Sequence, residues 1–168
     1  MIYIYNCYGG THSSSIASAY HLGLLPKNRV PNQNEILSTY LFNRLTYSDM
    51  GRIFYHGKDE NGDLVYSLAR GRCKHLVPAL KNLVSLFHEN QLNKQRVLFT
   101  NTSPTVPFAM TMGGFFARGL RMDPIGVPLL ITGVKQAYKD IQRLVHHTKE
   151  VGRSMTMDVM ILDNKEFK

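Results

Sequence analysis

Apolar residues occur along the chain in short runs that alternate with longer amphipathic stretches. The short runs have the length and composition of strands, most of them buried. They cover residues 2–7, 96–100, 125–131 and 157–162. Apolar positions at three- and four-residue spacing predict helices instead. These helices are expected over residues 16–22, 35–45, 73–89, 105–121 and 135–150.

Residues 52–57 and 64–69 predict a β-hairpin, because Asn61-Gly62 between them is a strong turn sequence. Short strands that alternate with helices favour an α/β fold: a three-layer sandwich with a largely parallel sheet and this one hairpin. The length of 168 residues suits a single domain, residues 1–168. Ligands of such sheets bind beyond the carboxyl ends of the strands.

The junction after the first strand carries the strongest functional signal. Two glycines there let the chain turn tightly, and the first amides of the following helix point, with its dipole, at an anion. The candidate anion-binding residues are Gly9, Gly10, Thr11, Ser13, Ser14 and Ser15. The junction has neither the lysine of a Walker A motif nor the spacing of GxGxxG. A second interpretation stays open, in which the glycines only turn the chain and a serine caps the helix.

Cys7 and His12 are the candidate catalytic residues at this junction, as nucleophile or base. The helix dipole would disfavour protonated His12. Structural roles are the alternatives, with Cys7 as a small buried residue and His12 as a solvent-facing turn residue.

Two other loops could complete an anion pocket. A basic turn precedes the helix of residues 73–89, and a polar cluster follows the strand of residues 96–100. Positive charge attracts anions, and polar residues after a buried strand suit ligand contacts. The candidates are Arg70, Arg72, Asn101, Thr102 and Ser103. A solvated basic turn and a helix cap are the structural alternatives.

The net charge of +8 favours an anionic partner, either a small molecule, a nucleic acid or an acidic protein. The basic residues are dispersed, without an RNA-binding, zinc-finger or helix-turn-helix signature, so nucleic acid is not favoured. The two cysteines lack disulfide or metal spacing, and no metal site or particular cofactor is indicated. No apolar run approaches about 18 residues, and no basic leader is present, so we expect a cytoplasmic protein that does not cross a membrane.

Residues 7–19 resemble the signature loop of low-molecular-weight tyrosine phosphatases, in which a strand-end cysteine opens a phosphate-cradling loop. The matching positions are Cys7, Gly9, Thr11, Ser14, Ala17 and Ala19. Asp123-Pro124 resembles the aspartate-proline pair that supplies the general acid of that family. The signature arginine is missing, because Ser13 stands in its place. The resemblance implies thiol-dependent phosphate chemistry, with Arg70, Arg72 or Lys74 as substitutes for the missing charge.

Three phrases, in residues 5–14, 19–26 and 56–62, resemble a family of short bacterial proteins catalogued as a domain of unknown function. This resemblance covers most of the chain and implies a bacterial, cytosolic protein, without an established reaction. The residues themselves predict binding of a phosphorylated or nucleotide-like anion at the glycine-rich loop, with phosphoryl transfer or phosphate-ester hydrolysis as the reaction if the protein is an enzyme. The alternative is a regulatory or scaffold protein whose basic surface docks an acidic partner. Whether the protein forms a homo-oligomer stays open.

Overall fold

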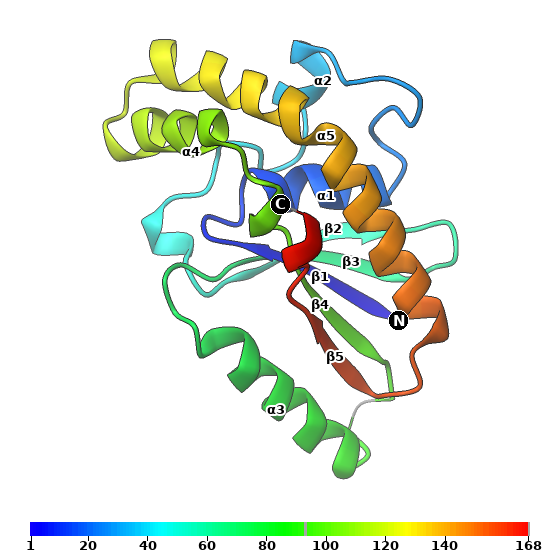
Figure 1. Cartoon of the computed structure of the whole chain (residues 1–168). Coiled ribbons are helices and arrows are strands. Elements are labelled where there is room, and N and C mark those ends of the chain that lie inside the picture. Colours follow the sequence, from blue (N-terminus) through cyan, green and yellow to red (C-terminus); the bar gives the residue numbers. More distant parts are fainter. Residues whose placement is uncertain (93, 168) are drawn as a thin grey trace.

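The computed structural model describes residues 1–92 and 94–167 and contains a five-stranded sheet in the order β2-β3-β1-β4-β5 (Figure 1). The strands are β1 (Ile2–Cys7), β2 (Ile53–Lys58), β3 (Leu64–Ala69), β4 (Val97–Asn101) and β5 (Val159–Leu162). β1 pairs in parallel with β3 and β4, and β4 pairs in parallel with β5. Only β2 runs antiparallel, as the first strand of the hairpin with β3. The predicted α/β fold is confirmed.

Helices cover both faces of the sheet, as Figure 1 shows. The α-helices are α1 (Ser13–His21), α2 (Gln33–Leu37), α3 (Leu76–Glu89), α4 (Phe108–Gly114) and α5 (Asp123–Ser154). A π-helical turn, Phe115–Gly119, follows α4 directly. α1 and α5 lie on one face, and α3 lies on the other. Among the described residues, no helix is long and apolar enough to cross a membrane.

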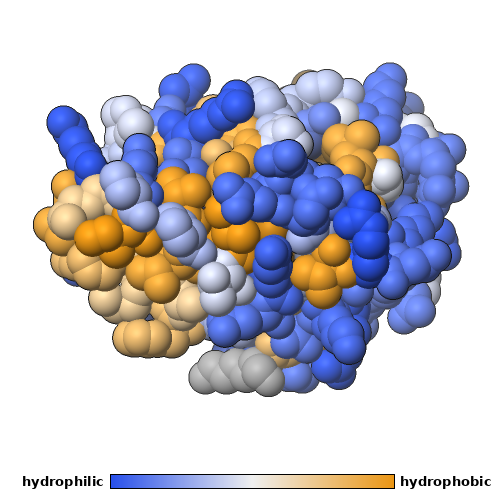
Figure 2. Space-filling view, turned by 90° about the horizontal axis from the view of Figure 1, so that it is seen from above, coloured by the Kyte–Doolittle hydropathy of each residue, from blue (hydrophilic) through white to orange (hydrophobic). Residues whose placement is uncertain are grey.

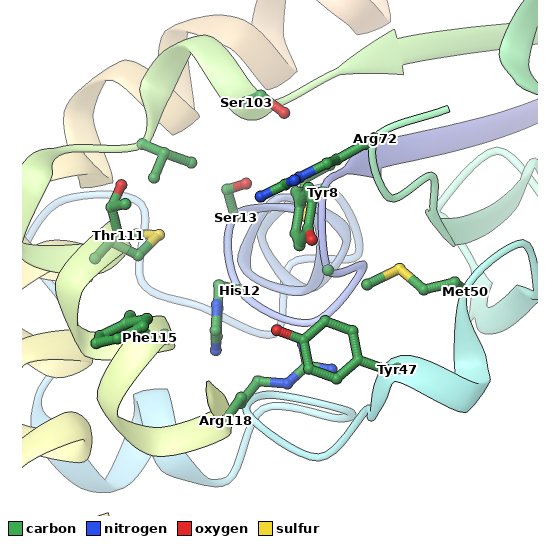
Figure 3. Close-up of a pocket in the computed structure, with 15 residues that line it drawn as sticks. Tyr8, His12, Ser13, Tyr47, Met50, Arg72, Ser103, Thr111, Phe115 and Arg118 are labelled. Carbon is green, nitrogen blue, oxygen red and sulfur yellow. The ribbon is translucent and has the colours of Figure 1, made fainter. Parts of the chain in front are cut away.

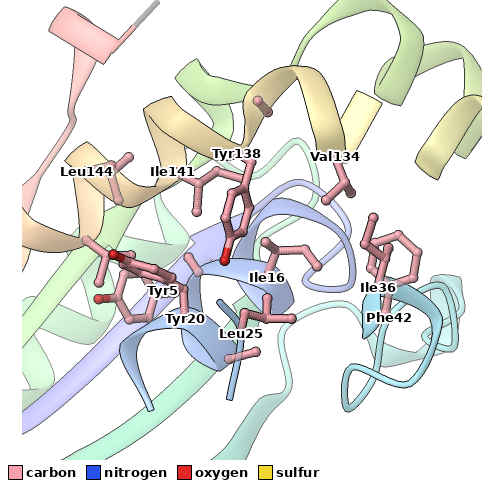
Figure 4. Packing of buried hydrophobic residues seen from close by; sticks show 14 of the residues in the cluster. Tyr5, Ile16, Tyr20, Leu25, Ile36, Phe42, Val134, Tyr138, Ile141 and Leu144 are labelled. Carbon is pink, nitrogen blue, oxygen red and sulfur yellow. The ribbon is translucent and has the colours of Figure 1, made fainter. Parts of the chain in front are cut away.

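The larger core lies between the sheet and the α1/α5 layer (Figure 4). Tyr5 of β1, Ile16 of α1 and Ile141 of α5 are completely buried there. A smaller core beneath α3 joins Ile4 and Phe99 to Val77. β1 and β4 are thus covered on both sides, which explains why their sequences are continuous apolar runs rather than alternating ones.

The expected helix over residues 35–45 was wrong beyond Leu37, where α2 ends. Leu41 and Asn43 have positive φ angles, which an α-helix does not allow. The reason is a set of hydrogen bonds with distant Thr11. Its backbone oxygen accepts from the Asn43 amide at 3.2 Å, and its hydroxyl donates to the Leu41 carbonyl and accepts from the Arg44 amide. Thr11 therefore imposes a turn on a segment whose local pattern is helical.

The expected strand over residues 125–131 was also wrong, because this run belongs to α5, which also includes the predicted helix of residues 135–150. Gly126 and Leu130 of this run pack against the preceding helical segment. A Cβ atom built on Gly126 would lie only 2.4 Å from the Ala117 backbone nitrogen. A short apolar run does not by itself distinguish a buried strand from a buried helix. Here the close packing of this run against the preceding helix favours the helix.

A buried hydrogen-bond chain ties the hairpin to α1. The Tyr5 hydroxyl lies 2.7 Å from Nδ1 of His21, and Nε2 of His21 lies 3.2 Å from Oδ2 of Asp59. Burial, with a smaller effect of the Lys149 charge, lowers the pKa of His21 to about 4. Burial likewise lowers the pKa of His56 to about 4, and its Nε2 lies 2.9 Å from the Ser67 hydroxyl.

The protein should lose stability on mild acidification. Between pH 6.5 and 4, His21 and His56 bind protons in the unfolded chain but stay neutral in the folded protein. The free energy of unfolding therefore falls as the pH falls. Urea unfolding at several pH values measures this slope. His56→Gln keeps an amide for Ser67 and should reduce the slope by up to about 1.4 kcal/mol per pH unit. An unchanged slope in the variant would contradict the assignment.

Candidate functional site

A cavity of about 530 Å³ lies beyond the carboxyl ends of β1 and β4 (Figure 3). Five parts of the chain line it. They are the loop after β1, the segment before β2, the turn after β3, the segment after β4, and α4 with its π-helical turn. Because these parts are distant in sequence, the cavity exists only in the folded chain.

Cys7 is the last residue of β1, and its thiol is enclosed by the loop that follows it. The sulfur accepts a hydrogen bond from the Gly10 amide at 3.1 Å and lies 3.2 Å from the Ser14 hydroxyl. Cys7 lines the cavity although only 5% of its surface is exposed. The sulfur therefore has two polar neighbours from the loop, a backbone amide and a side-chain hydroxyl.

Gly10 makes this enclosure possible. Its φ angle is +65°, and a Cβ atom there would lie 2.7 Å from the Cβ atom of Ala69 in β3. No side chain fits between the loop and the sheet, and the left-handed backbone also favours glycine. The loop is therefore pressed onto β3, which directs the Gly10 amide at the sulfur.

Several backbone amides of the loop have no acceptor among the residues that the structure describes. Within residues 1–92 and 94–167, the amides of Gly9 and of residues 11–15 donate no hydrogen bond to another protein group. Those of Ser13, Ser14 and Ser15 open α1 and have no intrahelical acceptor. Free donors at a helix N-terminus beside a cavity form a favourable environment for an anion.

His12 stands at the start of α1 and lines the cavity. Its Nε2 lies 3.3 Å from Oδ1 of Asn43, and its ring packs edge-on against Phe42. Burial lowers the pKa of His12 to about 4, with the Arg118 charge acting in the same direction. The imidazole is therefore neutral at pH 7 and is able to accept a proton from a bound molecule.

Two serines of the predicted site, Ser13 and Ser103, line the cavity, and neighbouring residues hold them by hydrogen bonds. The Ser13 hydroxyl lies 2.9 Å from that of Thr102, and Ser103 accepts a hydrogen bond from Arg70 at 3.0 Å. Thr102 and Arg70 therefore hold the lining residues rather than face the cavity themselves.

The cavity lining includes six of the predicted site residues: Cys7, Gly9, His12, Ser13, Arg72 and Ser103. The others pack behind it or beside it: Gly10, Thr11, Ser14, Ser15, Arg70, Asn101 and Thr102. Asn101 accepts from the Ser103 amide at 3.0 Å, and Ser15 donates to the Gly10 carbonyl at 3.5 Å. Asp123 is exposed at the start of α5 and does not line the cavity.

Sequence reasoning missed Arg118, the second arginine of the cavity. It lies on the π-helical turn, and its Nη1 atom would be 2.7 Å from a Cβ atom built on Gly9. Burial lowers the pKa of its guanidinium. No local motif marks this arginine, because 109 positions separate it from Gly9 in the chain.

The mouth of the cavity is apolar and aromatic. Tyr8, Tyr47 and Phe115 line it and are 44%, 63% and 52% exposed. Figure 2 shows apolar side chains gathered on the side of the molecule formed by α4 and the start of α5. The exposed apolar residues of this region are Phe108, Phe115, Leu120, Met122 and Ile125. A ligand in the cavity would therefore meet polar groups at the loop and apolar groups at the mouth.

A family model described as "Protein of unknown function (DUF3189)" matches residues 2–150, and the chain belongs to this family. The predicted membership of an uncharacterised family is thus confirmed. No curated protein and no solved structure gives a significant match to the chain.

Gly10→Ala should destabilise the protein more than the same change at Gly23. Both glycines have positive φ angles, but a Cβ atom at Gly23 would have no neighbour within 4 Å, whereas one at Gly10 meets Ala69. We expect about 1 kcal/mol from backbone strain at Gly23 and a clearly larger loss at Gly10. Urea unfolding compares the two variants. Equal losses would show that the loop is not pressed onto β3.

Proposed function

We propose that this family member binds phosphorylated small molecules at the loop of residues 8–15 and hydrolyses their phosphate monoester, with Cys7 as the nucleophile. The observation that carries the proposal is the Cys7 sulfur, which contacts the Gly10 amide and the Ser14 hydroxyl at the edge of a large cavity. A buried structural cysteine needs neither donor nor access to a cavity.

The free amides supply the second requirement, a place for the phosphate oxygens. Three consecutive serine amides open α1 without an acceptor, and the helix dipole adds partial positive charge there. Arg72 and Arg118 add full positive charge to the cavity lining. Phosphate carries up to two negative charges at pH 7, so this environment favours it over a neutral ligand.

The reaction would proceed in two displacements. The Cys7 thiolate attacks phosphorus, the S–P bond forms, the P–O bond breaks, and the leaving oxygen takes a proton from solvent. Water then attacks phosphorus while neutral His12 accepts a proton from it. The S–P bond breaks with its electron pair returning to sulfur, inorganic phosphate leaves, and His12 releases its proton to solvent. The thiol thereby divides one difficult displacement into two easier ones.

The mouth of the cavity supports an apolar or aromatic substituent on the phosphate. Tyr8, Tyr47 and Phe115 present ring surface there. Planar rings pack well against such side chains and gain from burial of apolar area. An aryl phosphate is therefore the probe best matched to this cavity.

Replacement of the nucleophile tests the proposal. The protein should hydrolyse p-nitrophenyl phosphate, and Cys7→Ser should lower kcat by at least about 1,000-fold, as expected for the loss of a covalent nucleophile. Release of p-nitrophenol measures the rate. Cys73→Ser is the matched control, because Cys73 is exposed and does not line the cavity. Hydrolysis by Cys7→Ser at the normal rate would contradict the mechanism.

Phosphate binding separates this proposal from the docking of an acidic protein. Inorganic phosphate should raise the melting temperature of both the native protein and Cys7→Ser, because the loop amides remain in place. If the native protein binds phosphate but does not hydrolyse the ester, the proposed binding site is supported and the proposed enzymatic activity is contradicted. A melting temperature that phosphate leaves unchanged would instead favour a docking protein with a basic surface.

A further inference from the structure

We infer that Arg118, carried by the π-helical turn after α4, is the residue that holds the phosphate over Cys7, in place of the arginine that the loop lacks at Ser13. The inference rests on the proposed function. It assigns to a helix distant in sequence the bidentate contact that a phosphate site needs from a guanidinium.

The position of the guanidinium is the first argument. Its Nη1 atom occupies the space beside Gly9 that a side chain would otherwise take, since a Cβ atom there would approach it to 2.7 Å. Gly9 directly follows Tyr8 at the start of the loop, two positions beyond the thiol. Figure 3 shows Arg118 directed toward the part of the cavity between His12 and Tyr47. The guanidinium thus lies beside the loop whose amides are free.

The lack of a protein partner is the second argument. In the described part of the chain, no hydrogen bond or salt bridge involves the Arg118 side chain. Burial disfavours its charge and lowers its pKa. A guanidinium has five donors, and those of Arg118 are open to solvent or to a ligand in the cavity. The Asp49 charge acts against this effect of burial, without contact between the two side chains.

The helical turn that carries Arg118 is the third argument. Residues 115–119 form a π-helical turn, in which the Leu120 amide donates to the Phe115 carbonyl at 3.1 Å. Such turns insert an extra residue into a helix, change the direction of the side chains, and are frequent at functional sites. The neighbouring Ala117 packs directly against Gly126 of α5, which fixes the backbone next to Arg118.

The other arginines near the cavity are less suited to this role. Arg70 already donates from Nη2 to the Ser103 hydroxyl at 3.0 Å. Arg72 lines the cavity from the turn after β3 but is exposed, and in the view of Figure 3 its side chain extends across Tyr8 toward Ser13. Arg72 would attract an anion to the mouth, whereas Arg118 is half-buried beside the loop itself.

Three substitutions test the inference, with Arg118→Met as the main variant. It should lower kcat/KM for p-nitrophenyl phosphate by about 100-fold or more, the usual loss when one donor to developing charge is removed. It should also weaken binding of inorganic phosphate, measured by titration calorimetry. Arg118→Lys keeps the charge but not the fork, and should recover little of the rate. Arg121→Met removes the same charge three positions away, outside the cavity lining, and should stay within about twofold of the native protein.

Chemical rescue distinguishes a direct contact from a structural role. Added guanidinium ion should restore part of the activity of Arg118→Ala and leave Arg121→Met unchanged, which a merely misfolded variant would not show. Equal rates for Arg118→Met and Arg121→Met, in a protein that does hydrolyse the substrate, would overturn the inference and leave the proposed function standing. The inference would be overturned as well if Arg72→Met lost activity while Arg118→Met kept it. A native protein that neither hydrolyses the ester nor binds phosphate would overturn both.

Discussion

The close packing of Gly10 against Ala69 is the constraint on which the site depends. The turn that joins β1 to α1 leaves no room for a side chain at Gly10. Because the turn is held against β3, the Gly10 amide and the Ser14 hydroxyl both reach the Cys7 sulfur. The same turn leads into α1, whose first residue, Ser13, lines the cavity. Position of the thiol and orientation of the helix therefore follow from one contact.

Two further contacts build the walls around this turn. Thr11 binds the turn of residues 41–45 through its hydroxyl and its backbone, and this turn leads to Tyr47. On the opposite side, the approach of Ala117 to Gly126 holds the π-helical turn against α5. Between them, burial keeps His12 neutral by lowering its pKa to about 4. The fixed positive charge of the cavity lining is then that of Arg72 and Arg118.

The sequence predicted what local patterns determine. The parallel strands, the hairpin at Asn61-Gly62, the amphipathic stripe of α3 and the loop around Cys7 all have signals within a few residues. Residues 38–45 and 125–131 were misjudged, because the hydrogen bonds of Thr11 and the packing of α5 against the preceding helix override local preference. Arg118 escaped notice for the same reason. Its place beside Gly9 depends on how the π-helical turn packs near the loop, which no spacing within one segment can indicate.

The central claim is that an anion rests on the loop amides above the Cys7 sulfur, with Arg118 as its partner. A crystal structure of the protein with orthovanadate, which mimics a phosphate under attack by a thiolate, tests it most directly. The account predicts vanadium bonded to the Cys7 sulfur, with its oxygens within hydrogen-bond distance of the free amides of the loop of residues 8–15 and of the Arg118 guanidinium. Vanadate bound elsewhere, or an empty loop at saturating vanadate, would contradict it.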